Sequence, residues 1–405
     1  MMSLVGIFAI LLIAYAFSSH RSQINWRTVG GAFAIQLAIG AFVLNTQSGK
    51  DVLITMSDTV SHVISYANDG IVFLFNDAGA KKYGFVFAIH VLTVIIFFSS
   101  LIAVLYHTGI MRIVITVLGG GLQKLLGTSK PESMSAAANI FVGQTEAPLV
   151  VKPFIPNMTR SELFAVMVGG LASVAGSVLA GYALMGIELK YLIAASFMAA
   201  PGGLLMAKIL LPETEQARDD FTNMDMTEQK STNVIDAAAS GAASGLMLAL
   251  NVGAMLLAFV GLIALVNGLV GWLGTLVGLE GLTLQQIFGY VFQPLAFILG
   301  VSWDEARLAG SFIGQKLVIN EFVAYLDFVK HVQAGDLSPH TQIIVTFALC
   351  GFANLSSIAI LLGGLGSLAP TRRSDIAELG VKALFAATLA NLMSAAIAGF
   401  FFSLS

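Results

Sequence analysis

Asn139-Ile-Phe-Val-Gly-Gln-Thr-Glu-Ala-Pro148 and Leu317-Val-Ile-Asn-Glu-Phe-Val-Ala-Tyr325 decide the fold, because each places a carboxylate inside a segment that is otherwise apolar. The two carboxylates are Glu146 and Glu321. An ionisable group at membrane depth costs about 2.5–3.5 kcal/mol on insertion scales, so it is a candidate for function rather than for packing.

Each of these stretches is followed by a short break in an apolar run. The first break is Gly170-Leu-Ala-Ser-Val174 and the second is Gly351-Phe-Ala-Asn-Leu355. Polar, interrupted helices that recur in both halves of a chain are typical of secondary transporters. The pattern therefore predicts a protein that moves a solute across a membrane.

The composition agrees with a membrane protein. Of 405 residues, 57% are hydrophobic and 11% are charged, whereas soluble domains have about 25% charged residues. The net charge of −3 shows no basic excess, so nucleic acid is excluded as a partner. Cys350 is the only cysteine, which rules out an intrachain disulfide, and the six histidines show no metal-ligand spacing.

The apolar segment from Leu4 to Phe17 could be a signal peptide or a first transmembrane helix. No positive charge precedes it, whereas Arg21 and Arg27 follow it. This order is the reverse of that in a signal peptide. We therefore expect a retained helix with its N-terminus outside.

Eight apolar segments have the length of a membrane span. They are 3–18, 29–46, 85–106, 161–184, 190–211, 240–272, 341–368 and 379–403. Basic residues gather in the loops that lie inside when the N-terminus is outside, which are those with Arg21, Arg27, Arg112, Lys124, Lys130, Lys152, Arg160, Arg218, Lys230, Arg372 and Arg373. The prediction is an all-α integral membrane protein with both termini outside.

Four further segments do not fit simple spans. Residues 110–126 and 283–301 are apolar but short, and we expect helices along the membrane interface. Residues 131–157 and 304–334 each carry one of the buried glutamates, and we expect two re-entrant helical hairpins. Such hairpins are tolerated where their tips are covered by protein or face water.

These elements occur twice in the same order. A first repeat is predicted at 85–211 and a second at 240–405, joined by an inner polar linker at 212–239, with helices 1 and 2 and an outer segment at 1–84 as added scaffold. Three crossings separate the two hairpins, so they enter from opposite faces and the repeat is inverted. Gly241 and Gly245 have the spacing of close helix packing, either within the chain or between subunits.

The polar groups at the hairpin tips and helix breaks predict the class of ligand. An ionised carboxylate only accepts hydrogen bonds, so two of them suit a neutral ligand rich in N–H and O–H donors. No arginine lies near either tip to clamp a carboxylate or a phosphate. The candidate residues are Gln144, Thr145, Glu146, Glu321, Asn354, Ser356 and Ser357, with Phe352 and Val178 for apolar contact with a ring.

A cation site is also predicted. Backbone carbonyls at the first hairpin turn (Asn139, Val142) and at the first helix break (Ser173, Val174) are hard oxygen ligands. Unwound helices in transporters coordinate Na⁺ in this way. From the residues alone, the alternative for Ser173 is a structural role in which its hydroxyl bonds the helix backbone.

Three segments closely resemble signatures of the concentrative nucleoside transporter family. They are Asn139 to Glu146, Asn320-Glu-Phe-Val-Ala324 and Gly351-Phe-Ala-Asn-Leu-Ser-Ser357. The resemblance covers nearly the whole chain in the same order. It points to the bacterial sodium-coupled branch, because Asn139 and Thr145 are of the sodium type.

The resemblance implies roles for individual residues. Gln144, Thr145 and Glu146 would bind the nucleobase, with Val178 and Phe352 lining the base pocket. Glu321, Asn354 and Ser357 would hold the ribose hydroxyls. Asn139, Val142, Ser173 and Val174 would bind Na⁺, the co-transported ion.

The resemblance also implies a homotrimer in which a transport domain slides against a scaffold. We expect a Na⁺/nucleoside symporter of the bacterial cytoplasmic membrane that takes up uridine, other pyrimidine nucleosides and, as a further class, purine nucleosides. Three alternatives stay open: proton coupling through Glu146 or Glu321, a facilitative channel, and an intramembrane enzyme. No Ser/His/Asp grouping supports the enzyme.

Overall fold

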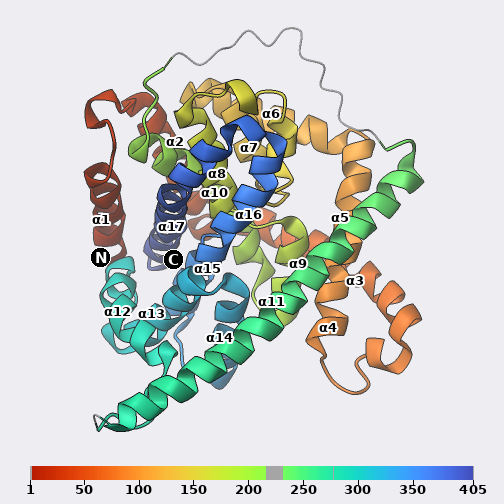
Figure 1. Ribbon diagram of the computed structural model, residues 1–405, viewed down its shortest axis with the longest axis vertical. Helices are drawn as coiled ribbons and strands as arrows, with labels where there is room; N and C mark the ends of the chain where they lie inside the picture. Colours follow the sequence, from red (N-terminus) through yellow and green to blue (C-terminus); the bar gives the residue numbers. More distant parts are fainter. Residues whose placement is uncertain (1, 216–230, 277, 405) are drawn as a thin grey trace.

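The computed structural model describes residues 2–215, 231–276 and 278–404. Within these ranges the protein is all-α, with helices α1 to α17, four short 3₁₀ helices and no strand (Figure 1). The predicted fold class is confirmed. Most of the predicted linker, residues 216–230, lies outside the described residues.

The N-terminal part has three helices where two were expected. They are α1 (Met2–Ala16), α2 (Trp26–Asn45) and α3 (Gln47–Gly79), with a 3₁₀ turn η1 (Arg21–Gln23) after α1. The prediction treated the region of α3 only as an outer segment, because several charged residues keep its hydropathy low. Its buried residues Leu53, Ile64, Ala67 and Ile71 follow the helical period and mark one packed face.

The first predicted repeat contains a broken helix and an irregular hairpin. Its elements are α4 (Phe87–His90), α5 (Leu92–His107), α6 (Ile110–Leu126), α7 (Lys130–Ala138), η2 (Ala147–Val151), η3 (Ile155–Asn157), α8 (Arg160–Ala172), α9 (Gly176–Met185) and α10 (Leu189–Leu210). The second arm of the hairpin at 131–157 is not an α-helix. Pro148, Pro153 and Pro156 explain this difference from the prediction, since proline removes a helical hydrogen-bond donor.

The second predicted repeat has a hairpin with two helical arms. Its elements are α11 (Val234–Leu276), α12 (Leu284–Leu299), α13 (Trp303–Val318), α14 (Glu321–Ala334), α15 (Pro339–Leu349), α16 (Leu355–Leu368), η4 (Pro370–Arg372) and α17 (Arg373–Phe402). Helix α11 begins at Val234, so the end of the predicted linker is helical.

The number of spanning helices differs from the eight predicted. Among the described residues, six helices are long and apolar enough to cross a membrane, or up to seven if the bent pair α12 and α13 forms one span. Two predicted spans do not meet this test. Helix α1, in the predicted span 3–18, has 15 residues, and 341–368 is divided between α15 and α16.

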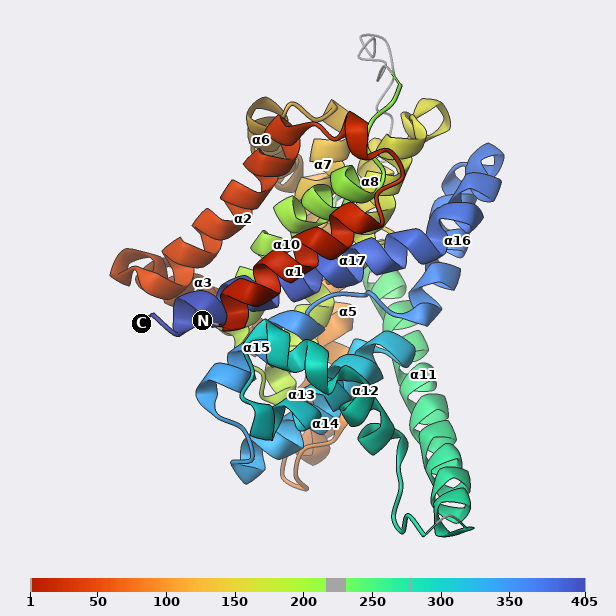
Figure 2. The same cartoon turned by 90° about the vertical axis from the view of Figure 1, so that its left-hand side faces the viewer.

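The elements around the two hairpins lie at opposite ends of the molecule. Helices α6 and α7 are at one end, and α12, α13 and α14 are at the other end in both views (Figures 1 and 2). Helices α8, α10 and α17 pack on one another and are mostly buried, so they form the centre that holds both helix breaks.

The long helix α11 lies on the outside of this centre and packs along α5 (Figure 1). A Cβ at Gly241 would lie 2.7 Å from the carbonyl oxygen of Ser99, and one at Gly245 would lie 2.8 Å from the Cα of Ile96. The two glycines therefore serve packing within the chain. The two chain termini lie close together in both views (Figures 1 and 2).

Candidate functional site

The first helix break lies between α8 and α9. Helix α8 ends at Ala172 because Ser173 is extended (φ −105°, ψ 174°), and helix α9 begins at Gly176. Gly176 donates its backbone N–H to the Phe141 carbonyl of the first hairpin at 2.9 Å. The hairpin tip is thus hydrogen-bonded to the break.

The turn of the first hairpin carries polar atoms that have no partner. Asn139 and Gln144 are buried, and the carboxamide oxygen and nitrogen of Asn139 and the Oε1 of Gln144 make no hydrogen bond. Their positions follow from glycines on α8. A Cβ at Gly169 would lie 3.0 Å from Asn139 Nδ2, and one at Gly170 would lie 3.0 Å from Gln144 Cβ. Buried polar groups normally have hydrogen-bond partners. Because these atoms have none within the protein, they are available to bind a ligand or an ion.

Thr145 and Glu146 complete this tip. A Cβ at Gly364 on α16 would lie 2.8 Å from the Thr145 methyl group, so the tip also contacts α16. The prediction that Glu146 is buried is wrong for the single chain, since its side chain at the hairpin tip is exposed and its carboxylate lies over Gly143. Val142 in the hairpin turn and Val174 at the helix break are both buried. The Ser173 hydroxyl makes only a long hydrogen bond of 3.4 Å to the Gly170 carbonyl.

A second cluster surrounds Glu321, which is 3% exposed. Its carboxylate accepts hydrogen bonds from the Tyr182 hydroxyl and the Asn354 Nδ2, both at 3.0 Å. Asn354 caps α16, since its Oδ1 accepts from the backbone N–H and the hydroxyl of Ser357, each at 3.0 Å. Ser356 also donates to this oxygen at 2.7 Å. The structure therefore brings together the three residues predicted for ribose binding.

The two helix breaks meet in the middle of the protein. The Phe352 N–H donates to the Ser173 carbonyl at 3.1 Å. Asn391 on α17 donates from its Nδ2 to Ala172 O at 2.7 Å and to Cys350 O at 3.1 Å, which ties the ends of α8 and α15. Phe352 is half-buried and Val178 is buried.

Tyr182, Lys316 and Asn391 belong to this region and were missed by the sequence prediction. Lys316 gave a usable signal, because a lysine in a hairpin expected at membrane depth needs a partner. Tyr182 lies four residues after Val178, on the same helical face. Asn391 gave no signal, since one amide in a long apolar helix is not distinctive.

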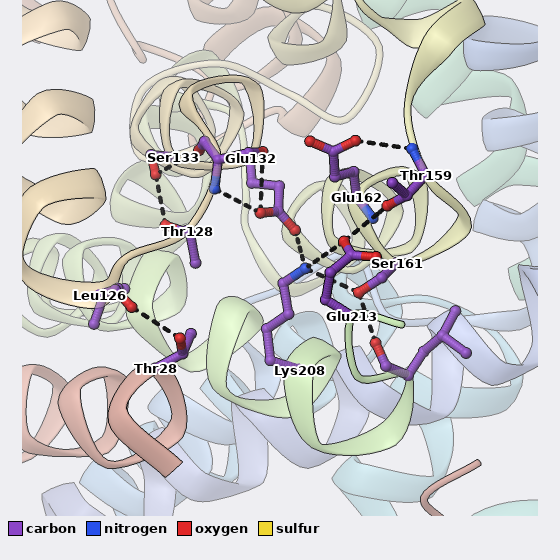
Figure 3. A network of polar contacts seen from close by, with 12 residues as sticks. Thr28, Leu126, Thr128, Glu132, Ser133, Thr159, Ser161, Glu162, Lys208 and Glu213 are labelled. Carbon is purple, nitrogen blue, oxygen red and sulfur yellow. Dashed lines mark hydrogen bonds and ion pairs between the residues drawn. The ribbon is translucent and has the colours of Figure 1, made fainter. Parts of the chain in front are cut away.

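A buried polar network lies at the base of the first hairpin (Figure 3). Lys208 on α10 forms an ion pair with Glu132 on α7 and donates to the Ser161 hydroxyl at 2.9 Å. Its Nζ is also 3.8 Å from Glu213, which accepts from Thr159 Oγ1 at 2.8 Å. The network joins α7, α8 and α10 to the start of the linker.

Comparison with protein families identifies the chain over most of its length. The family model described as "Na+ dependent nucleoside transporter C-terminus" matches residues 191–399. The model for the N-terminus of the same transporters matches residues 5–78. A model described as "Nucleoside recognition" matches residues 88–188.

Relatives of similar sequence occur in bacteria and mammals. The chain is 52% identical to the nucleoside permease NupC of Helicobacter pylori, covering 100% of this chain and 98% of the relative. It is 59% identical to an uncharacterised transporter of Haemophilus influenzae, covering 99% and 98%. Sodium/nucleoside cotransporter 1 of Rattus norvegicus is 40% identical, with 98% of this chain and 63% of the longer relative covered.

Solved structures of CNTnw have the same fold. The inward-facing substrate-bound state is 59% identical and gives a TM-score of 0.95, with 100% of this chain and 98% of that chain covered. A double variant in an outward-facing state is also 59% identical and gives a TM-score of 0.98, with 100% and 99% covered. The protein is therefore a membrane transporter and not an enzyme, and it belongs to the concentrative, Na⁺-dependent nucleoside transporter family.

Proposed function

We propose that this protein is a Na⁺-coupled symporter that imports nucleosides, with uridine and other pyrimidine nucleosides first and purine nucleosides as a further class. The observation that carries the proposal is the unpartnered amide of Asn139 together with the unpartnered Oε1 of Gln144, beside the break between α8 and α9. One amide supplies an oxygen for a cation and the other supplies an edge for a nucleobase.

The nucleobase site comprises Gln144, Thr145 and Glu146, with Val178 and Phe352 in contact with the base. A carboxamide offers both a donor and an acceptor, and a carboxylate accepts N–H groups. Thr145 contacts α16, the helix that carries Ser357. A nucleoside held by both groups would therefore lie between the first hairpin and α16.

The ribose site comprises Glu321, Asn354 and Ser357. Glu321 already accepts from Asn354 and Tyr182, and each carboxylate oxygen has a further lone pair for a ribose hydroxyl. Hydrogen bonds to a charged group contribute about 1.5–3 kcal/mol each. Tyr182 and Asn354 fix the orientation of the carboxylate before the sugar arrives.

The Na⁺ site comprises Asn139, Val142, Ser173 and Val174. These residues offer carbonyl, carboxamide and hydroxyl oxygens, which suit a hard cation. Bound Na⁺ would order the hairpin turn next to Gln144 and so favour nucleoside binding. The nucleoside must then raise the affinity for Na⁺ by the same factor.

The driving force is sufficient for accumulation. One positive charge that moves through ~100 mV gains about 2.3 kcal/mol, and a tenfold Na⁺ gradient adds about 1.4 kcal/mol. A total of ~3.7 kcal/mol supports about a 500-fold nucleoside gradient at one Na⁺ per nucleoside.

The assembly is proposed to be a homotrimer in the bacterial cytoplasmic membrane with both termini outside. The transport cycle is an elevator motion of the two hairpins with α8, α9, α10, α15, α16 and α17. Support comes from CNTnw, which is known in inward-facing, intermediate and outward-facing states. The basic residues in the loops predicted to lie inside, and the closeness of the two termini (Figures 1 and 2), support the orientation.

Proton coupling is the second candidate. Glu321 is buried and its hydrogen-bond partners Tyr182 and Asn354 are neutral, so it could carry a proton. Glu146 is exposed at the hairpin tip and is the other candidate carrier.

Uptake of labelled uridine into proteoliposomes separates these functions. An inward Na⁺ gradient is compared with an equal choline gradient, with the same pH gradient across the membrane in both. Accumulation above equilibrium only with Na⁺ is the expected result. Equal accumulation with both cations that disappears when the pH gradient is removed would assign the coupling to a carboxylate, and equilibration without accumulation would indicate a facilitative channel.

A further inference from the structure

Lys316 is a buried cation whose role the proposed sites leave open. It lies on α13 in the second hairpin and is only 3% exposed. A buried charge in such a place needs strong compensation. Among the ion pairs of the described ranges none includes Lys316, so the atoms it contacts directly are neutral oxygens, while the Glu321 carboxylate lies near enough to attract the ammonium.

These oxygens belong to the end of a broken helix. The Lys316 ammonium donates to Ala348 O at 2.8 Å and to Asn391 Oδ1 at 2.6 Å. Ala348 is in the last turn of α15, just before the break at Cys350. The C-terminal end of a helix carries unpaired carbonyls and about half a negative charge, which attract a cation.

The corresponding place in the first repeat has no ammonium group. There the hairpin offers the Asn139 carboxamide, which makes no hydrogen bond, to the end of α8 and the break at Ser173. In both halves, a hairpin residue thus faces the end of the first half of a broken helix. One half presents an unpartnered amide and the other presents a positive charge.

Asn391 connects the two places directly. Its Nδ2 binds Ala172 O at the end of α8 and Cys350 O after α15, while its Oδ1 accepts from Lys316. The packing leaves no room for another group, since a Cβ at Gly351 would lie 2.3 Å from Asn391 Oδ1. The ammonium therefore occupies an oxygen-lined site that has no room for a further ligand.

We propose that the Lys316 ammonium acts as a covalently attached cation. It occupies, in the second half of the chain, the position that corresponds to the Na⁺ site of the first half. This inference rests on the proposed Na⁺ site. Since one of the two cation positions is occupied by a side chain, the protein carries one exchangeable cation per nucleoside. Removal of the ammonium leaves oxygens of Ala348 and Asn391 free, and a second Na⁺ replaces it.

The test measures the ratio of Na⁺ to uridine from the reversal potential of transport in proteoliposomes. Wild type is expected to give a ratio of one and Lys316→Ala a ratio of two. Lys316→Arg keeps the charge and is expected to stay at one. Lys382→Ala is the matched control, because Lys382 on α17 binds the Ser19 hydroxyl, away from both breaks. A ratio of one for Lys316→Ala overturns the inference.

Equilibrium binding of radioactive Na⁺ to purified protein with saturating uridine covers the case in which Lys316→Ala does not transport. Two bound Na⁺ per chain in this variant, or in Lys316→Ser if the alanine variant does not fold, support the inference, and one or none contradicts it. Two exchangeable Na⁺ in wild type overturn it without any variant. Uridine uptake by wild type that ignores Na⁺ would instead refute the proposed function.

Discussion

Glu321 is a buried side chain whose surroundings require a hydrogen-bond acceptor at both of its oxygens. Its two oxygens receive donors from Tyr182 and Asn354, so the group must stay an acceptor on both sides. A carboxylate does this and a carboxamide does not. The same argument applies to the ribose hydroxyls, which would donate to the remaining lone pairs.

Glu321→Gln is expected to reduce uridine uptake at least about tenfold while the protein stays folded. The new NH₂ group faces donors, and loss of one charge-assisted bond costs about 1.5–3 kcal/mol. Uptake at low uridine concentration is the measurement. Glu188→Gln, in an exposed ion pair with Lys190, is the control. Uptake like that of wild type would remove Glu321 from the ribose site.

Ser173→Ala is expected to raise the Na⁺ concentration that gives half-maximal uptake severalfold. The hydroxyl makes one long hydrogen bond in the structure, so its loss removes an oxygen ligand with little effect on packing. Ser196→Ala, which removes a hydroxyl bonded to Leu192 O on α10, is the control. If the Na⁺ dependence of Ser173→Ala equals that of the control, the cation site lies elsewhere.

The two helix breaks were the elements that the sequence predicted best. Charge in an apolar stretch and a Gly-x-Ala break are local signals, and both breaks occur where they were expected. Hydrogen-bond partners that are far apart in the sequence gave no such local signal. Asn391 and Ala172 are separated by 219 positions, and only the packing of α8 on α17 brings them together. Helix α3 was not predicted, because its charged residues lower its hydropathy although its buried residues follow the helical period.

Gly351→Ala is expected to abolish most uptake, because its Cβ would lie 2.3 Å from Asn391 Oδ1 and 2.7 Å from Ala172 O. The junction of the two breaks would have to open. Gly363→Ala on α16 is the matched control, since a Cβ there meets no atom within 4 Å. Uptake and thermal unfolding in detergent are measured together. Equal uptake and equal unfolding temperatures of the two variants would show that the two helix breaks can move apart without loss of function.

The base of the first hairpin depends on the ion pair between Lys208 and Glu132. Lys208→Met is expected to destabilise the protein by about 3–5 kcal/mol, because it leaves a buried carboxylate without its partner. Thermal unfolding is the measurement. The double variant Lys208→Met/Glu132→Gln should recover much of the loss, since both charges are removed. A double variant as unstable as the single one would show that packing, and not charge, is lost.

Many large apolar side chains stay exposed on the single chain, among them Phe8, Leu12, Phe73, Leu257 and Trp272. Lipid and neighbouring subunits are the surroundings that suit such a surface. The whole assembly is expected to be a homotrimer, with about three times the protein mass of one 42.6 kDa chain. Light scattering with subtraction of bound detergent measures this mass, and a value for one chain or two would refute the trimer.

Helix α11 has 43 residues and, after Asp236, no charged side chain. At 1.5 Å per residue it is about 64 Å long, roughly twice the ~30 Å hydrocarbon thickness of a bilayer. In lipid, a helix of this length must tilt, kink or extend beyond the hydrocarbon at its ends. The thickness of the bilayer around the transporter then affects how α11 lies in the membrane. Because hydrophobic mismatch costs free energy, lipids of different acyl-chain length are expected to change the tilt of α11 and, through it, the rate of transport.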